Sequence, residues 1–319
     1  MNRVFTIILS VFLLFACEQK KDDYRIAIVS IVEIDPIVQL RNGFKEEFSQ
    51  SEFARSHQYS FKEYNAQNDA GLQNQIVDTL VTNKPDMIYV LGTPLAQALQ
   101  KRLPDVLLVQ GTSTDPVSAG LADSWNGSGR NYIATTDLPP IEKQVNLIKR
   151  LTPHVKKLGV IYNPGEINSV AVIKKMREFL ASNQTGIEIV ERPIATTAEV
   201  ATATNSLIGR VDAIYLPPDN TAHAAIPVIG RIATEYKIPF YVTVESALEH
   251  GALATLSLDF HEMGKETARL ALEVLNGKNP KTLPIRVSEN PLITISRKSA
   301  SRLNIDLSGI GKNENIIIK

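Results

Sequence analysis

The stretch DMIYVLGTPLAQAL, from Asp86 to Leu99, and the stretch DAIYLPPDNTAHAA, from Asp212 to Ala225, decide the fold. Each stretch begins with a short apolar run, passes through a turn that contains proline, and continues with apolar residues at helical spacing. This order is typical of a parallel strand followed by its crossover helix. Because the unit occurs twice, about 130 residues apart, we predict two similar α/β lobes.

Two further pairs of segments repeat in the same order. IAIVSIV (26–32) corresponds to LGVIYNP (158–164), and LPDVLLVQG (103–111) corresponds to KIPFYVTV (237–244). A single continuous sheet would not require this repetition. We therefore expect an α/β protein with two similar doubly wound parallel-sheet lobes and a ligand cleft between them.

The expected elements fall into two series. The first half predicts strands at 25–31, 59–64, 86–91 and 105–109, with helices at 36–49, 72–81 and 94–102. The second half predicts strands at 157–162, 187–191, 211–216, 239–242, 252–258 and 292–296, with a helix at 262–275 that Gly277 and Pro280 end. That last helix could return to the first lobe, which would give several crossings between the lobes.

The joint between the lobes is placed at Thr135–Pro140, whose prolines and polar residues suit a linker. The first lobe is accordingly assigned residues 24–135 and about 259–284. The second lobe is assigned residues 136–258 and about 285–319.

An N-terminal targeting signal precedes the lobes. Asn2 and Arg3 lead into an apolar run, Val4–Ala16, which is too short for a comfortable membrane span and is typical of a secretory signal. The run ends at Cys17, the only cysteine of the chain, in a context close to the bacterial lipobox. We expect a signal peptide at 1–16, a lipid-anchored tether at 17–23, and attachment to a membrane of the cell envelope through a diacylglycerol on Cys17. The alternative is a cleaved signal in which Cys17 is an accidental thiol.

The composition excludes several classes of function. Lysine plus arginine and aspartate plus glutamate both number 34, so the chain lacks the basic excess of a nucleic-acid binder. The sequence contains no G-x-S-x-G, Walker A, G-x-G-x-x-G or H-E-x-x-H motif, and its five histidines are scattered. We expect no enzyme activity, no cofactor and no metal.

Polar residues gather where the expected strands end, and in a doubly wound sheet ligands bind beyond those ends. The candidate ligand-binding residues are Glu33, Thr93, Thr114, Asp115, Asn163, Glu166, Asn168, Ser169, Asp219, Asn220 and Glu245. The hydroxyl groups and the helix N-termini suit a carboxylate, and the carboxylates suit an ammonium group, so a zwitterionic solute would fit. Taken singly, several of these residues are equally typical of ordinary N-caps and turns.

Five motifs carry a family resemblance: GTPLAQAL (92–99), TDPVSAGL (114–121), YNPGEINS (162–169), LPPDNT (216–221) and DFHEMGKETA (259–268). With them the chain resembles the ABC-transporter substrate-binding family whose better-known members bind tryptophan, tyrosine or related amino acids on a type I periplasmic-binding-protein fold. The resemblance spans nearly the whole chain after the signal. It implies ligand contact from the loops that hold Thr93, Asp115, Asn163, Glu166, Asn168, Ser169 and Asp219.

The chain departs from the family pattern in two places. Where the family commonly has Glu-His-Pro after the first strand, this chain reads Glu33-Ile34-Asp35-Pro36-Ile37-Val38, so a changed ligand is an alternative. His223 stands where the family often has a small residue, and we favour a structural role for it.

The resemblance implies an extracytoplasmic solute-binding lipoprotein of an ABC importer, a monomer that closes on an amino acid and serves a permease and its ATPase. An aromatic or branched amino acid is expected, with Tyr162, Tyr215 and Tyr241 as candidates for an aromatic wall. A lipid-anchored sensor that signals to a receptor is an alternative. A hydrolase with Ser169 as nucleophile is less favoured, because no nearby histidine supports it.

Overall fold

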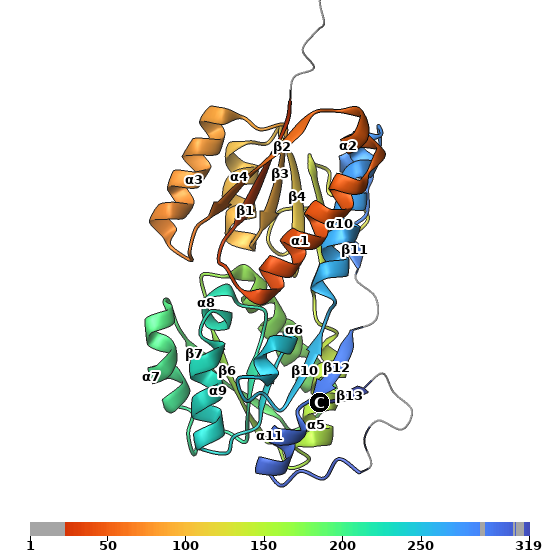
Figure 1. Ribbon diagram of the computed structural model, residues 1–319. Coiled ribbons are helices and arrows are strands. Elements are labelled where there is room, and N and C mark those ends of the chain that lie inside the picture. The colour runs from red at the N-terminus through yellow and green to blue at the C-terminus, as the bar shows by residue number, and fades with distance from the viewer. Residues whose placement is uncertain (1–22, 288–290, 309, 311–315) are drawn as a thin grey trace, which may run out of the picture.

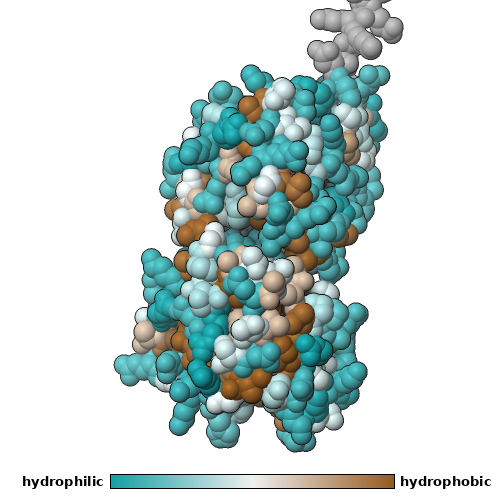
Figure 2. All heavy atoms as spheres, turned by 90° about the vertical axis from the view of Figure 1, so that its left-hand side faces the viewer, coloured by the Kyte–Doolittle hydropathy of each residue, from teal (hydrophilic) through white to brown (hydrophobic). Residues whose placement is uncertain are grey.

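The computed structural model describes residues 23–287, 291–308, 310 and 316–319, which form two lobes stacked along one axis (Figure 1). The predicted signal peptide, Cys17 and all of the tether except Asp23 lie outside the described residues. The space-filling view shows that the outline narrows where the lobes meet, and that hydrophilic residues cover most of the first lobe's visible face (Figure 2). Within the described segments no helix is both long and apolar enough to cross a membrane.

The first lobe is a parallel sheet in the order β11-β5-β4-β3-β1-β2 with helices on both faces. Its strands are β1 (Tyr24–Ser30), β2 (Tyr59–Asn65), β3 (Met87–Leu91), β4 (Leu107–Thr112), β5 (Tyr132–Thr136) and β11 (Arg286–Val287). Its helices are α1 (Asp35–Gln50), α2 (Glu52–Ser56), α3 (Ala70–Asn83), α4 (Thr93–Arg102) and α10 (Phe260–Leu275), followed by the short η3 (Pro280–Thr282). All five residues of β3, MIYVL, are buried, as expected for a central parallel strand covered on both faces.

The second lobe is a seven-stranded sheet in the order β13-β12-β10-β9-β8-β6-β7. Its strands are β6 (Lys157–Tyr162), β7 (Glu188–Pro193), β8 (Ala213–Leu216), β9 (Phe240–Val242), β10 (Ala254–Ser257), β12 (Leu292–Ile295) and β13 (Ile316–Ile318). Its helical segments are α5 (Ile141–Leu151), α6 (Ile167–Ser182), η1 (Thr197–Glu199), α7 (Val200–Asn205), α8 (Asn220–His223), α9 (Ile226–Glu235), η2 (Glu245–Leu248) and α11 (Arg297–Arg302). β12 runs antiparallel to β10, so only this edge of the sheet departs from the parallel arrangement.

The two sheets share one plan. The order β2-β1-β3-β4-β5 in the first lobe is repeated as β7-β6-β8-β9-β10 in the second. Corresponding strands also follow one another in the same order along the chain in the two lobes, as the sequence repeats indicate. The predicted α/β fold with two similar doubly wound lobes is confirmed.

Two predicted boundaries differ in the structure. Thr135 and Thr136 are not linker residues, because the five residues Tyr132–Thr136 form the buried strand β5. The Thr135 hydroxyl, which looks polar in the sequence, donates to the Gly111 carbonyl 2.7 Å away inside the sheet. β11 pairs with β5, so the first lobe extends to Val287 and not to about 284.

Helix α10 returns from the second lobe and packs along α1 (Figure 1). Two glycines allow the close approach of the helices. A Cβ atom added at Gly43 would lie 2.0 Å from the His261 carbonyl oxygen, and one added at Gly264 would lie 2.2 Å from the Leu40 carbonyl oxygen. Both contacts are far inside van der Waals distance, so neither position has room for a side chain.

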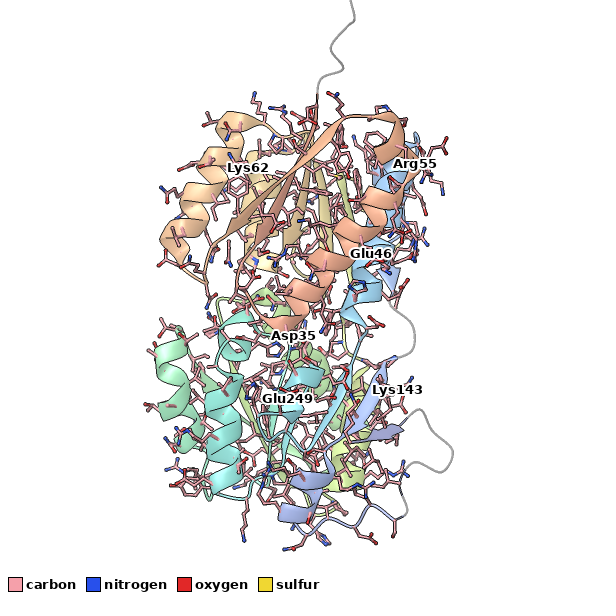
Figure 3. The ribbon with its side chains drawn as sticks, in the orientation of Figure 1. Asp35, Glu46, Arg55, Lys62, Lys143 and Glu249 are labelled. Carbon is pink, nitrogen blue, oxygen red and sulfur yellow. The ribbon has the colours of Figure 1, made fainter. Side chains whose placement is uncertain are left out.

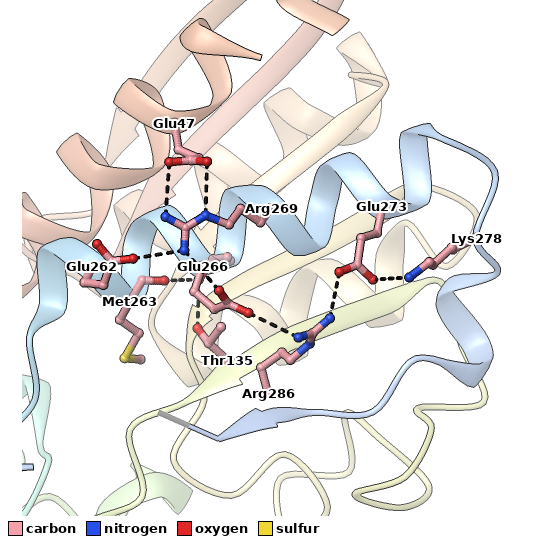
Figure 4. A network of polar contacts seen from close by, with 10 residues as sticks. Glu47, Thr135, Glu262, Met263, Glu266, Arg269, Glu273, Lys278 and Arg286 are labelled. Atoms are coloured by element: carbon pink, nitrogen blue, oxygen red, sulfur yellow. Dashed lines mark hydrogen bonds and ion pairs between the residues drawn. The ribbon is translucent and has the colours of Figure 1, made fainter. Parts of the chain in front are cut away.

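A network of ion pairs links α10 to α1 and to β11 (Figure 4). Arg269 on α10 donates to Glu47 on α1 at 3.0 Å and to Glu262 at 2.9 Å. Arg286 on β11 reaches Glu273 at 2.7 Å, and thereby joins the last strand of the first sheet to α10. The network connects three segments of the first lobe that are far apart in the sequence.

The chain passes between the lobes three times. The connections are 137–140 after β5, 258–259 after β10, and the segment between β11 and β12. A hinge at such connections would let the lobes open and close on a ligand.

Candidate ligand-binding site

A pocket lies between the lobes at the carboxyl ends of the strands. The first lobe contributes Ile34, Pro36, Ile37, Leu40, Gly92, Thr93, Thr112, Thr114, Asp137 and Phe260, and the second contributes Asn168, Pro218, Asp219, Asn220, His223, Thr243 and Val244. Most of these residues lie in the loops and helices that follow the carboxyl ends of strands, as expected of a ligand site in doubly wound sheets. Figure 3 shows Asp35 at the end of α1 that faces the second lobe, whereas Glu46 lies farther up the same helix. The segment that departs from the family pattern, 33–38, therefore supplies part of the pocket wall.

Asp137 is the first-lobe carboxylate of the pocket. It accepts hydrogen bonds from the Thr112 hydroxyl at 2.6 Å and the Thr114 hydroxyl at 2.7 Å. Burial raises the pKa of Asp137, although these hydroxyls oppose the shift. The sequence assigned Asp137 to the linker, and the signal that could have identified it is its position directly after a strand.

Glu166 supports the pocket floor in the second lobe. Its side chain is buried and accepts from the backbone N–H groups of Asn220 and Thr221, each at 2.9 Å. The Asn220 amide and the Thr221 hydroxyl also donate to it, at 2.5 and 2.8 Å. Glu166 therefore holds the start of α8 in place. It is not among the residues that line the pocket, although the sequence suggested it as a ligand residue.

Asp219 lies between Glu166 and the pocket. Its carboxylate accepts from the backbone N–H groups of Ala222 at 2.8 Å and Asn163 at 2.7 Å. Burial, reinforced by the charge of Glu166, raises the pKa of Asp219 to about 7. Asp219 lines the pocket, whereas Asn163 turns into the floor, where its amide also donates to Thr221 at 3.0 Å.

Asn168 and His223 complete the second-lobe wall. The Asn168 amide donates to the Pro218 carbonyl at 3.0 Å and to Glu166 at 3.3 Å. His223 is only 8% exposed, and burial lowers its pKa to about 4 despite a hydrogen bond to the Pro217 carbonyl. The sequence favoured a structural role for His223, but the structure places it in the pocket lining.

Of the predicted ligand residues, Thr93, Thr114, Asn168, Asp219 and Asn220 line the pocket. Glu33 instead pairs with Arg41 at 2.7 Å on the surface, and Glu245 pairs with Lys319. The sequence pattern does not show which way either side chain points.

Asp115 bridges the lobes beside the pocket. It accepts from the backbone N–H of Ser118 at 2.9 Å and forms an ion pair with Lys175 of α6 at 3.2 Å. A second direct contact between the lobes joins the Asn68 amide to the Thr221 hydroxyl at 3.3 Å. The lobes are therefore in direct polar contact, through residues next in sequence to the pocket-lining Thr114 and Asn220.

The structure does not support Ser169 as a nucleophile. Its buried hydroxyl donates to the carbonyls of Glu166 at 3.0 Å and Asn163 at 3.3 Å. No group of three or more histidine, cysteine, aspartate or glutamate residues in the described part of the chain could hold a metal ion.

The three tyrosines expected to form an aromatic wall lie elsewhere. The Tyr162 hydroxyl donates to Glu191 at 2.6 Å, Tyr241 bonds Thr152 at 2.7 Å, and Tyr215 is buried in the second-lobe core. None of the three is among the residues that line the pocket. Phe260, at the start of α10, is the aromatic residue that lines the pocket.

We expect Asp219 and His223 to have opposite effects on the pH dependence of stability. Asp219 has a folded pKa of about 7, above its ordinary value, so its contribution is lost as the pH rises from about 4 to 7. His223 has a folded pKa of about 4, below its ordinary value, so its contribution is lost as the pH falls from about 6.5 to 4. Urea unfolding at pH 5, 6 and 7 should therefore show that His223→Leu is stabilised by acid relative to the parent protein and that Asp219→Asn is destabilised, each by up to about 1.4 kcal/mol per pH unit. Parallel pH profiles for both variants and the parent would contradict these shifted pKa values.

Comparisons with known proteins agree with the fold. The family model described as ABC transporter substrate binding protein matches residues 25–315. A tyrosine-binding protein of Clostridioides difficile is 33% identical over 292 residues, which cover 90% of this chain and 84% of that protein.

Solved structures show the same arrangement. The crystal structure of a conserved domain protein from Vibrio cholerae has a TM-score of 0.86 and 30% identity, and the match covers 92% of this chain and 99% of that one. The ABC domain in complex with L-Trp from Streptococcus pneumonia has a TM-score of 0.87 and 26% identity, over 93% of this chain and 100% of that one. With the family model spanning both lobes, the chain belongs to the ABC transporter substrate-binding proteins, which bind solutes and are not enzymes.

Proposed function

We propose that this protein captures an aromatic amino acid between its two lobes outside the cytoplasm and delivers it to an ABC permease and its ATPase. The observation that carries the proposal is the pair of carboxyl groups that the pocket contains. Asp137 and Asp219 reach it from opposite lobes, and no lysine or arginine is among its lining residues. Such a pocket suits a ligand with an ammonium group. A tyrosine-binding relative and a relative solved with L-Trp support an aromatic amino acid as the ligand.

The pocket has a place for each part of an amino acid. The ammonium group would approach Asp137, whose two oxygens each have acceptor capacity beyond the threonine hydrogen bonds. The carboxylate would approach the Thr93 hydroxyl and the N-terminal end of α4, which carries the positive end of the helix dipole. An apolar side chain would contact a wall that the lining residues Ile34, Pro36, Ile37, Leu40, Val244 and Phe260 provide.

Binding would proceed by hinged closure. The two polar contacts between the lobes, Asp115 with Lys175 and Asn68 with Thr221, would break when the lobes separate. A closed form with the solute inside would be the form that the permease recognises.

The proposal includes a lipid anchor on Cys17. β1 begins at Tyr24, at the end of the first lobe farthest from the second (Figure 1). An anchor seven residues before Tyr24 would attach the molecule by this end and leave the pocket free to open.

Calorimetry with the twenty amino acids tests the ligand class. The full chain, purified in detergent and freed of retained solute by unfolding and refolding, should bind an aromatic amino acid one to one with a Kd on the order of 1 μM. Asp137→Asn should weaken this binding about 100-fold, because the ammonium group loses its charged partner. Asp78→Asn, a surface change on α3 at a side chain that is 66% exposed, is the matched control and should bind as the parent does. Unchanged affinity in Asp137→Asn would remove Asp137 from the site. Saturable binding of a solute other than an amino acid would overturn the ligand class.

A further inference from the structure

Two buried acceptor atoms in the pocket lining have no hydrogen-bond partner. The first is Nε2 of His223, which no donor among the described residues reaches. Because the other ring nitrogen donates to the Pro217 carbonyl, Nε2 of the neutral imidazole carries a lone pair and no proton. The lowered pKa, about 4, keeps the ring neutral at physiological pH.

The second is Oδ1 of Asn168, which likewise lacks a partner within the part of the chain that the structure describes. The orientation of this amide follows from its neighbours. Its nitrogen contacts the Pro218 carbonyl at 3.0 Å and the Glu166 carboxylate at 3.3 Å, and both of these can only accept. The oxygen is therefore the end that remains without a donor.

Both residues are more than nine-tenths buried, at 8% and 6% exposure, and both line the same wall of the pocket from the second lobe. A buried polar atom without a partner is unfavourable, and two such atoms on one wall of a ligand pocket call for a donor on the ligand. The ammonium group is better satisfied elsewhere, because Asp137 offers it a carboxylate from the opposite lobe. The neutral acceptors suit a neutral N–H or O–H group.

We infer that His223 and Asn168 form a specificity wall that selects amino acids whose side chain carries a hydrogen-bond donor, such as a phenol O–H or an indole N–H. This inference rests on the proposed function. It narrows the expected ligands, because branched aliphatic and phenyl side chains would leave both acceptors unpaired. Sites built to bond such a donor reject the analogue that lacks it by large factors.

Matched ligand pairs test the specificity wall. L-tyrosine is compared with L-phenylalanine, and L-tryptophan with 1-methyl-L-tryptophan, so that each pair differs at one donor. Calorimetry on the full chain should favour the donor-bearing member of at least one pair by about 100-fold or more. His223→Leu should reduce that ratio to within about threefold, chiefly by weakening the donor-bearing member. His223→Gln, which keeps an acceptor in reach, should retain part of the preference.

The control is His154→Leu, the same substitution at an exposed histidine outside the pocket, which should leave the ratio unchanged. Equal binding of both members of each pair by the parent protein would overturn the inference while leaving the proposed function standing. So would an unchanged ratio in His223→Leu. Binding of no aromatic amino acid would overturn the proposed ligand and the inference together. The ratio in the parent protein requires no substitution, so the outcome does not depend on whether a variant folds.

Discussion

Replacing Glu166 with alanine is expected to abolish ligand binding and to lower the free energy of unfolding by about 3–5 kcal/mol. The carboxylate is 3% exposed and accepts hydrogen bonds from the backbone of Asn220 and Thr221 and from their side chains. Its removal would leave the buried N–H and hydroxyl groups of Thr221 and the partly buried N–H of Asn220 without an acceptor, at about 1–3 kcal/mol for each buried group. The start of α8 would then move, and Asp219 and His223 would move with it.

Urea unfolding monitored by circular dichroism would measure the loss of stability, and calorimetry with the cognate amino acid would measure affinity. Glu178→Ala is the matched control. Glu178 lies on α6, the helix that begins directly after Glu166, and its side chain is 63% exposed. The control should change stability by less than about 0.5 kcal/mol. A Glu166→Ala variant as stable as Glu178→Ala would show that the hydrogen bonds of the floor are dispensable.

Gly264→Ala should destabilise the first lobe by about 3 kcal/mol. The new methyl group would lie 2.2 Å from the Leu40 carbonyl oxygen and 3.0 Å from the Phe44 backbone nitrogen, so α1 and α10 would have to move apart. Backbone atoms on both helices define this contact, and no change of side-chain rotamer can relieve it. Thermal unfolding of the variant should show the loss directly.

Gly71→Ala supplies the contrast within the same lobe. Gly71 lies in α3, where an added Cβ would meet only the end of the Asp69 side chain at 3.1 Å. Alanine favours helix over glycine by up to about 1 kcal/mol, so this variant should be as stable as the parent or slightly more stable. If the two alanine variants unfold at the same temperature, the close approach of α1 and α10 is not a source of stability.

The sequence predicted the architecture well because the signals for it are local. In each lobe, short apolar runs indicate the strands, and apolar residues at helical spacing indicate the helices. The repeat of DMIYVLGTP as DAIYLPPDN indicates the duplication. The strand β5 was missed because YIATT is short and its last two residues are polar. Their hydroxyls are satisfied inside the sheet by partners that are distant in the sequence, such as Gly111.

The candidate site remains a prediction, and only some of the residues suggested by the sequence line the pocket. The rule that ligands bind after strand ends located the loops of Thr93, Thr114 and Asp219. The rule cannot say which side chain of a loop enters the pocket. Glu166 braces residues that lie 54 positions farther along the chain, and that role becomes visible only when the loops are packed together.

The three passages of the chain between the lobes bear on the order in which the protein can fold. The first sheet needs β11, which ends at Val287, and its helix α1 needs α10 to cover it. A ribosome that has released residues 24–250 has therefore produced neither lobe in finished form. Such an interleaved chain would postpone its stable fold until synthesis is nearly complete, a delay that would suit the unfolded passage through a secretion channel that the proposed lipid anchor would require.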